Sequence, residues 1–164
     1  MVVSLHKLGA VGILHRFQKT IDEYLTDCEF IFSNKCPLDI SVGVNDLEYL
    51  KVLEKHENIN LLRSITIDIA HGHHKKMKTQ IGRVKDWIKN QNLDEQVDII
   101  AGNVCVSEAV QELGEWGANI IKVGIGPGSA CTTRIMTGYG VPQFSAVLKS
   151  AENKHDHNVK IIAD

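Results

Sequence analysis

A cysteine at position 131 ends a glycine-rich segment that directly follows a short apolar run. Gly124, Gly126 and Gly128 lie in this segment, and Pro127 stands between the last two. Glycine permits backbone angles that other residues avoid, and proline fixes one angle, so the segment can turn its amides and carbonyls toward a small ligand. Exposed amides or a nearby cation lower the pKa of a thiol. The pattern therefore predicts an active-site loop in which Cys131 is a nucleophile.

The other thiols and the histidine cluster do not have the spacing of a metal site. The remaining cysteines are scattered, without paired metal-ligand spacing or a dense disulfide framework, so we expect reduced, buried thiols at Cys28, Cys36 and Cys105. A histidine cluster could suggest a metal, yet no cysteine or carboxylate stands at zinc-finger spacing around it. We expect polar loop residues at His71, His73 and His74.

Apolar runs alternate with amphipathic stretches along the whole chain, which predicts an α/β fold with a parallel sheet. The expected strands are residues 12–14, 40–44, 64–69, 97–101, 120–124 and 159–163. The expected helices are residues 46–55, 75–90, 107–116 and 145–153, with Asp46 and Ser107 as N-caps of the first and third. Polar or glycine residues follow strand after strand. This favours a (β/α) barrel over a doubly wound sheet, because a barrel collects all these loops on one face.

Length and composition limit the possible partners. The chain has 164 residues with 43% hydrophobic content, which suits one domain, whereas a complete eight-unit barrel takes roughly 200 to 250 residues or more. A net charge of -2 and a pI near 6.4 indicate no nucleic-acid partner. The sequence contains neither a bilayer-spanning apolar run nor a signal-peptide pattern, so a soluble cytoplasmic protein is the expectation.

The cysteine loop, together with residues 137–147 after it, resembles the signature segment of the IMP dehydrogenase and GMP reductase family. Supporting matches occur in the family's order at residues 14–17, 41–44, 66–73, 101–103 and 161–164. The resemblance covers almost the entire chain. It implies an eight-stranded TIM barrel. Residues 1–164 would form a single incomplete catalytic domain of this barrel, which contains the second to seventh strands, or about six of the eight βα units. Within the family, the His-Arg-Phe and Asp-Ile-Ala-His-Gly-His motifs look more like those of GMP reductase than those of IMP dehydrogenase.

The resemblance also implies a chemistry for individual residues. Cys131 would add to C2 of GMP, ammonia would leave, and NADPH would deliver hydride to give IMP, while Thr133 would assist proton transfer. Ser129 would bind the nucleotide phosphate and Asp164 the ribose hydroxyls. The expected cofactor contacts are Arg16, Asp68, Ile69, Ala70, Asn103, Ile125 and Gly126. A potassium ion would be held by the backbone carbonyls of Gly126, Gly128, Cys131 and Arg134.

Two alternatives stay open. The Cys-Thr-Thr-Arg and Gly-Val-Pro-Gln segments also suit an IMP dehydrogenase without a regulatory module, which would oxidise IMP to XMP with NAD. The other alternative is a non-catalytic, nucleotide-binding fragment of the family. Because an interrupted barrel exposes two strand edges, such a chain would assemble with a complementary barrel segment or as a homo-oligomer, commonly a tetramer in the family.

Overall fold

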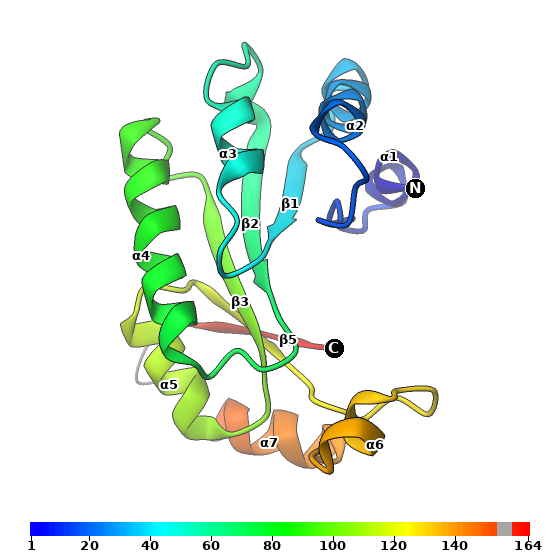
Figure 1. Cartoon of the computed structure of the whole chain (residues 1–164), viewed down its shortest axis with the longest axis vertical. Helices are drawn as coiled ribbons and strands as arrows, with labels where there is room; N and C mark the ends of the chain where they lie inside the picture. Colours follow the sequence, from blue (N-terminus) through cyan, green and yellow to red (C-terminus); the bar gives the residue numbers. More distant parts are fainter. Residues whose placement is uncertain (154–158) are drawn as a thin grey trace.

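The computed structural model describes residues 1–153 and 159–164, and in this part of the chain five parallel strands form one sheet (Figure 1). Their order in the sheet equals their order in the sequence, and each pairs in parallel with the next. The strands are β1 (Leu38–Val42), β2 (Leu62–Asp68), β3 (Asp98–Val104), β4 (Ile120–Val123) and β5 (Lys160–Ala163). The α/β class with a parallel sheet is therefore confirmed. This sequential order is the order that a barrel uses, and closure of a barrel remains a prediction.

Helices connect the strands and cover the sheet. Figure 1 shows α3, α4 and α5 following one another along one face, while α1 and α2 lie beside β1. The helical bounds are α1 Val2–Lys7, α2 Ile21–Ser33, α3 Glu48–Leu53, the 3-10 turn η1 Ile59–Leu61, α4 Lys75–Asn90, α5 Ser107–Glu115, α6 Thr133–Thr137 and α7 Gln143–Asn153. The bounds of α4 are those expected from the sequence. Its buried side chains recur every three or four positions, at Met77, Ile81, Val84 and Ile88, because one face packs on the sheet.

An ion pair with a buried carboxylate joins the amino-terminal ends of the first two strands. Asp39 on β1 is 1% exposed and accepts hydrogen bonds from Arg63 Nε at 3.0 Å and from the Ser64 hydroxyl at 2.6 Å. Both partners belong to β2. Because a buried carboxylate is tolerated only with such partners, this contact sets how β1 and β2 align. It leaves the carboxyl ends of the strands free to build a site.

The first expected strand, residues 12–14, is reduced to a single pairing residue. Leu14 forms an isolated parallel bridge with Ile40. Its N–H donates to Asp39 O at 2.8 Å, and its carbonyl accepts from the N–H and the hydroxyl of Ser41 at 2.9 and 3.1 Å. The chain bends away after Leu14, so the ladder along β1 does not continue. A short apolar run is compatible with a strand, but it does not establish that more than one of its residues pairs with the neighbouring strand.

Two helix starts differ from the expected ones. Asp46 and Ser107 were expected as N-caps, yet the caps are Leu47 for α3 and Val106 for α5. Asp46 instead approaches Arg16, with 3.7 Å between Asp46 Oδ2 and Arg16 Nη1. Because the Asp46 carboxylate pairs with Arg16, it does not cap α3.

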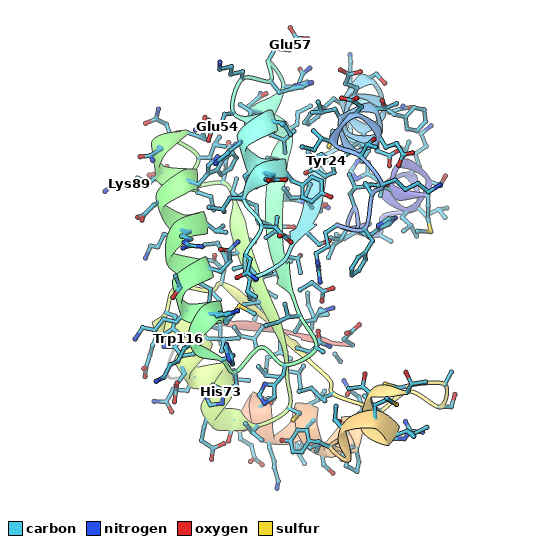
Figure 2. The ribbon with its side chains drawn as sticks, viewed as in Figure 1. Tyr24, Glu54, Glu57, His73, Lys89 and Trp116 are labelled. Carbon is cyan, nitrogen blue, oxygen red and sulfur yellow. The ribbon has the colours of Figure 1, made fainter. Side chains whose placement is uncertain are left out.

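The helix α2 was not anticipated, although its start carries a local signal. The Thr20 hydroxyl accepts a hydrogen bond from the Glu23 N–H at 3.2 Å, and the Glu23 carboxylate accepts from the Lys19 N–H at 3.1 Å. This Thr-x-x-Glu pattern is close to a capping box. Figure 2 shows Tyr24 pointing from α2 toward α3, where its ring lies 4.4 Å from that of Tyr49.

Candidate active site

The carboxyl ends of the strands gather a polar cluster around Lys122, which lies on β4. Lys122 Nζ is 2.9 Å from Asp68 Oδ1 at the end of β2 and 3.2 Å from Asp164 Oδ2 after β5. The amide of Asn103, on β3, donates to Asp164 Oδ2 at 2.6 Å and to the Gly124 carbonyl at 2.7 Å. Parallel strands end at the same edge of a sheet, which is why residues far apart in sequence meet here.

Charges within this cluster stabilise one another. Burial alone would lower the pKa of Lys122, but its hydrogen bonds and ion pairs with Asp68 and Asp164 raise it above the ordinary value. Burial would raise the pKa of Asp164, yet the hydrogen bond from Asn103 and the charge of Lys122 lower it overall. The Lys122 ammonium group therefore lies between the carboxyl groups of Asp68 and Asp164. The outer oxygens of these carboxylates suit hydroxyl donors.

Cys131 lies at the end of the glycine-rich loop, and the residues that follow it favour its thiolate. The hydroxyl of Thr133 and then its backbone N–H lower the pKa of the Cys131 thiol, and they outweigh the opposing effect of burial, with smaller lowering contributions from Arg134. The Cys131 N–H donates to the Gly128 carbonyl at 3.0 Å, which closes the loop. The Cys28 thiol differs, because burial raises its pKa to about 12. The role of Thr133 in proton transfer stays a prediction, and its effect on the pKa of the Cys131 thiol is compatible with that role.

A cavity of about 690 Å³ opens between the polar cluster and the cysteine loop. Its lining contains most of the residues expected from the sequence: Arg16, Asp68, Ile69, Ala70, Asn103, Ile125, Gly126, Gly128, Cys131, Thr133 and Asp164. Ser129 and Arg134 are not part of this lining, and both contribute to the loop beside it. Gly124 and Pro127 of the loop also line the cavity, as do Lys122 and Phe17, which were not expected. One cavity therefore joins the expected nucleophile to the expected cofactor contacts.

The side chain of Arg16 is only partly satisfied at this wall. Its guanidinium carbon lies 4.4 Å from the centre of the Phe17 ring. Its Nε is buried and has no hydrogen-bond partner among the described residues. A buried donor without a partner at the edge of a cavity fits an anionic ligand group such as a phosphate.

The three clustered histidines have different contacts. The His71 ring stacks on Tyr139 with 6.4 Å between centroids, and His73 Nε2 lies 3.2 Å from Glu112 Oε2. His74 caps α4 by accepting a hydrogen bond from the helix backbone. Among residues 1–153 and 159–164, no group of three His, Cys, Asp or Glu side chains could hold a metal ion. Nor does any helix in the same residues have the length and apolarity needed to cross a membrane.

Lys122 lies at the centre of the polar cluster, yet sequence reasoning did not name it. It is the single charged residue in the β-branched run 120–123, and a charge within a buried strand requires partners. Asp68 and Asp164 were both already named as site residues. The sequence therefore did contain a signal, because a lysine lies inside an apolar strand and two acidic residues follow other strands.

Three of the four carbonyls expected to hold potassium already have other partners. Arg134 Nη1 donates to the Gly126 carbonyl at 2.7 Å and also to the Gly128 carbonyl. The carbonyl of Arg134 itself accepts from the Gly138 N–H at 3.0 Å. Because a guanidinium group already lies on these oxygens, the arrangement does not fit a potassium ion on the same set.

A parallel sheet with a low-pKa cysteine loop and a polar cluster at its carboxyl end is the arrangement of an α/β enzyme. The family model described as the IMP dehydrogenase / GMP reductase domain matches residues 36–164. The chain therefore belongs to this family, whose members are oxidoreductases acting on purine nucleotides.

Relatives of both names are similar to the chain. A GMP reductase from Buchnera aphidicola (subsp. Acyrthosiphon pisum, strain Tuc7) is 35% identical over 167 residues, which cover 100% of this chain and 45% of that relative. The inosine-5'-monophosphate dehydrogenase of Methanocaldococcus jannaschii is 39% identical over 122 residues, covering 74% of this chain and 23% of the relative. That of Halalkalibacterium halodurans is 48% identical over 100 residues, covering 61% and 19%. The chain thus spans about half the length of the GMP reductase and less of the dehydrogenases.

Proposed function

We propose that this chain carries part of the active site of a GMP reductase, which converts GMP to IMP with NADPH. The observation that carries the proposal is the Cys131 thiol, held by Thr133 beside the cavity that Asp164 and Lys122 complete. The similarity to a GMP reductase along the whole chain supports the same activity, since the dehydrogenase matches cover only part of it.

Cys131 and Thr133 perform the substitution. The Cys131 thiolate forms a bond to C2 of the purine, and the exocyclic amine takes up a proton and leaves as ammonia, which gives a thioimidate on the protein. Thr133 lies in contact with the sulfur and passes the proton to the departing amine. A reduced nicotinamide, when bound, supplies the hydride for C2. The C2–sulfur bond then breaks and Cys131 is released as a thiolate.

Other residues bind and orient the two ligands. Asp164 accepts hydrogen bonds from the ribose hydroxyls of the nucleotide, and Ser129 binds its phosphate beside the loop amides. The unsatisfied Arg16 Nε is the donor available for a cofactor phosphate. The cofactor is bound by Arg16, Asp68, Ile69, Ala70, Asn103, Ile125 and Gly126.

IMP dehydrogenase is the second candidate function. The local identity favours it, with 48% over 100 residues to the Halalkalibacterium halodurans enzyme. In that reaction hydride leaves C2 of IMP for NAD, and water then hydrolyses the thioimidate to give XMP. In either case, because the chain spans 45% of the GMP reductase relative, we propose that turnover depends on a complementary barrel segment or on a homo-oligomer.

One pair of assays separates these functions. The chain is incubated with GMP and NADPH, and separately with IMP and NAD, while the absorbance of the reduced cofactor is followed. Loss of NADPH that depends on GMP supports the reductase, and formation of NADH with IMP replaces it by the dehydrogenase. Turnover that persists in Cys131→Ser contradicts both. Where neither reaction proceeds, calorimetric titration with GMP and IMP decides, because binding supports a nucleotide-binding fragment and absence of binding contradicts the proposal.

A further inference from the structure

Arg134 reaches back from α6 into the loop that precedes it. Its Nη1 donates to the carbonyls of Gly126, at 2.7 Å, and Gly128, and its Nη2 lies 3.4 Å from the Ser129 carbonyl. One side chain therefore holds three carbonyls of the same loop. A guanidinium group suits this task, because its donors are fixed in a planar fork and it stays charged.

Two glycines make room for this side chain. A Cβ atom at Gly126 would lie 3.0 Å from Arg134 Cβ, and one at Gly140 would lie 3.2 Å from the same atom. Gly126 also has a φ of +73°, a backbone conformation that other residues rarely adopt. The close approach of Arg134 to the loop therefore depends on glycine at both positions, so the arginine occupies a place that the backbone provides for it.

We propose that the Arg134 guanidinium takes the place of a monovalent metal cation in this loop, so that the chain orders its cysteine loop without potassium. Carbonyl oxygens that converge attract any cation, but the oxygens of Gly126 and Gly128 face the guanidinium and cannot enclose an ion as well. The inference rests on the proposed function only in naming Cys131 as the nucleophile. Its test measures the order of the loop and not turnover, so failure of one does not imply failure of the other.

The first measurement needs no variant. Hydrogen exchange of the peptide that contains residues 124–131 is followed by mass spectrometry in potassium chloride and in choline chloride of equal ionic strength. We expect exchange rates that agree within about twofold, because the loop opens with the same free energy in both salts. Exchange that is much faster in choline chloride would show that potassium orders the loop, and would overturn the proposal.

The second measurement removes the internal cation. Arg134→Met keeps much of the side-chain stem but loses the charge-assisted bonds, so loop exchange in choline chloride should rise by about tenfold or more. Potassium chloride should slow that exchange again, since the carbonyls are then free to bind the ion. Arg83→Met, an exposed arginine on α4, is the matched control. Unchanged loop exchange in Arg134→Met would contradict the proposal. Where this variant fails to fold, Arg134→Lys decides, because a point charge should restore only part of the protection.

Discussion

Lys122 Nζ lies 2.9 Å from Asp68 Oδ1, and this ion pair joins β4 to the end of β2 across the intervening β3. The same ammonium group also lies 3.2 Å from Asp164 Oδ2, beyond β5. A single lysine therefore links three strand ends at the floor of the cavity. Its loss would leave two partly buried carboxylates close together, with no cation between them.

Lys122→Met should consequently destabilise the fold. We expect a loss of about 1–2 kcal/mol in the free energy of unfolding, because the carboxylates of Asp68 and Asp164 lose their shared cation and water screens the remaining charges only in part. Urea denaturation at neutral pH measures this difference. Lys51→Met, an exposed lysine on α3, is the control and should change stability by no more than about 0.5 kcal/mol. Equal stability of the Lys122 variant and the unchanged chain would contradict the role given to the ion pairs.

Asp164 should stabilise the fold at neutral pH, and this contribution should be lost in acid. Its pKa is lowered in the folded chain, so the contribution is complete above the ordinary aspartate pKa of 3.8 and is lost as the pH falls through the folded value. The side chain is 48% exposed, so solvent screening limits the effect to about 1 kcal/mol or less. Unfolding of the unchanged chain and of Asp164→Asn, compared between pH 7 and pH 2, should show a gap that closes only at the acid end. Asp86→Asn on α4 is the control, and a gap that widens in acid would refute the assignment.

Cys131 should react as a low-pKa thiol that depends on Thr133. The rate of alkylation by iodoacetamide, followed by mass spectrometry across pH, should have its midpoint below the 9.0 of an ordinary cysteine. In Thr133→Val this midpoint should rise, because the hydrogen bond from the hydroxyl to the thiolate is lost. Thr79→Val removes a comparable helical hydroxyl on α4 and should leave the profile unchanged. A Thr133→Val profile identical to that of the unchanged chain would show that Thr133 does not act on the sulfur.

The ion pair between Arg63 and Asp39 should be a main anchor of the first two strands. Arg63→Met leaves the Asp39 carboxylate, 1% exposed, with only the Ser64 hydroxyl as a side-chain partner in the described structure. We expect a loss of about 2–4 kcal/mol, somewhat less than for a fully buried pair, because the Arg63 side chain is 38% exposed. Thermal unfolding beside Arg83→Met tests this. A change no larger than that of the control would contradict it.

The part of the site that lies within one segment could be predicted from the sequence. Gly126, Gly128 and Cys131 are neighbours in the chain, so the types of residue alone indicate a loop with a nucleophile. Thr133 follows at a spacing that already suggests contact. The parallel strands could likewise be predicted, because each is a separate apolar run between amphipathic segments.

Contacts between distant segments could not be predicted in the same way. The Cys105 sulfur lies 3.3 Å from the Tyr139 hydroxyl, and nothing local to either residue indicates this partner. The engagement of Arg134 with its own loop depends on how α6 turns back, and a helix of five residues leaves little periodic signal. Leu14 shows the same limit for strands, because its single bridge depends on the position of Ser41.

Protection of Cys131 by nucleotide tests the central claim most directly. The rate of iodoacetamide alkylation at Cys131 is measured with and without GMP, and with IMP. If this thiol faces the purine, nucleotide at about ten times its dissociation constant should slow the alkylation roughly tenfold. Alkylation that is equally fast with and without both nucleotides would contradict the claim that Cys131 is the nucleophile of a purine-nucleotide site.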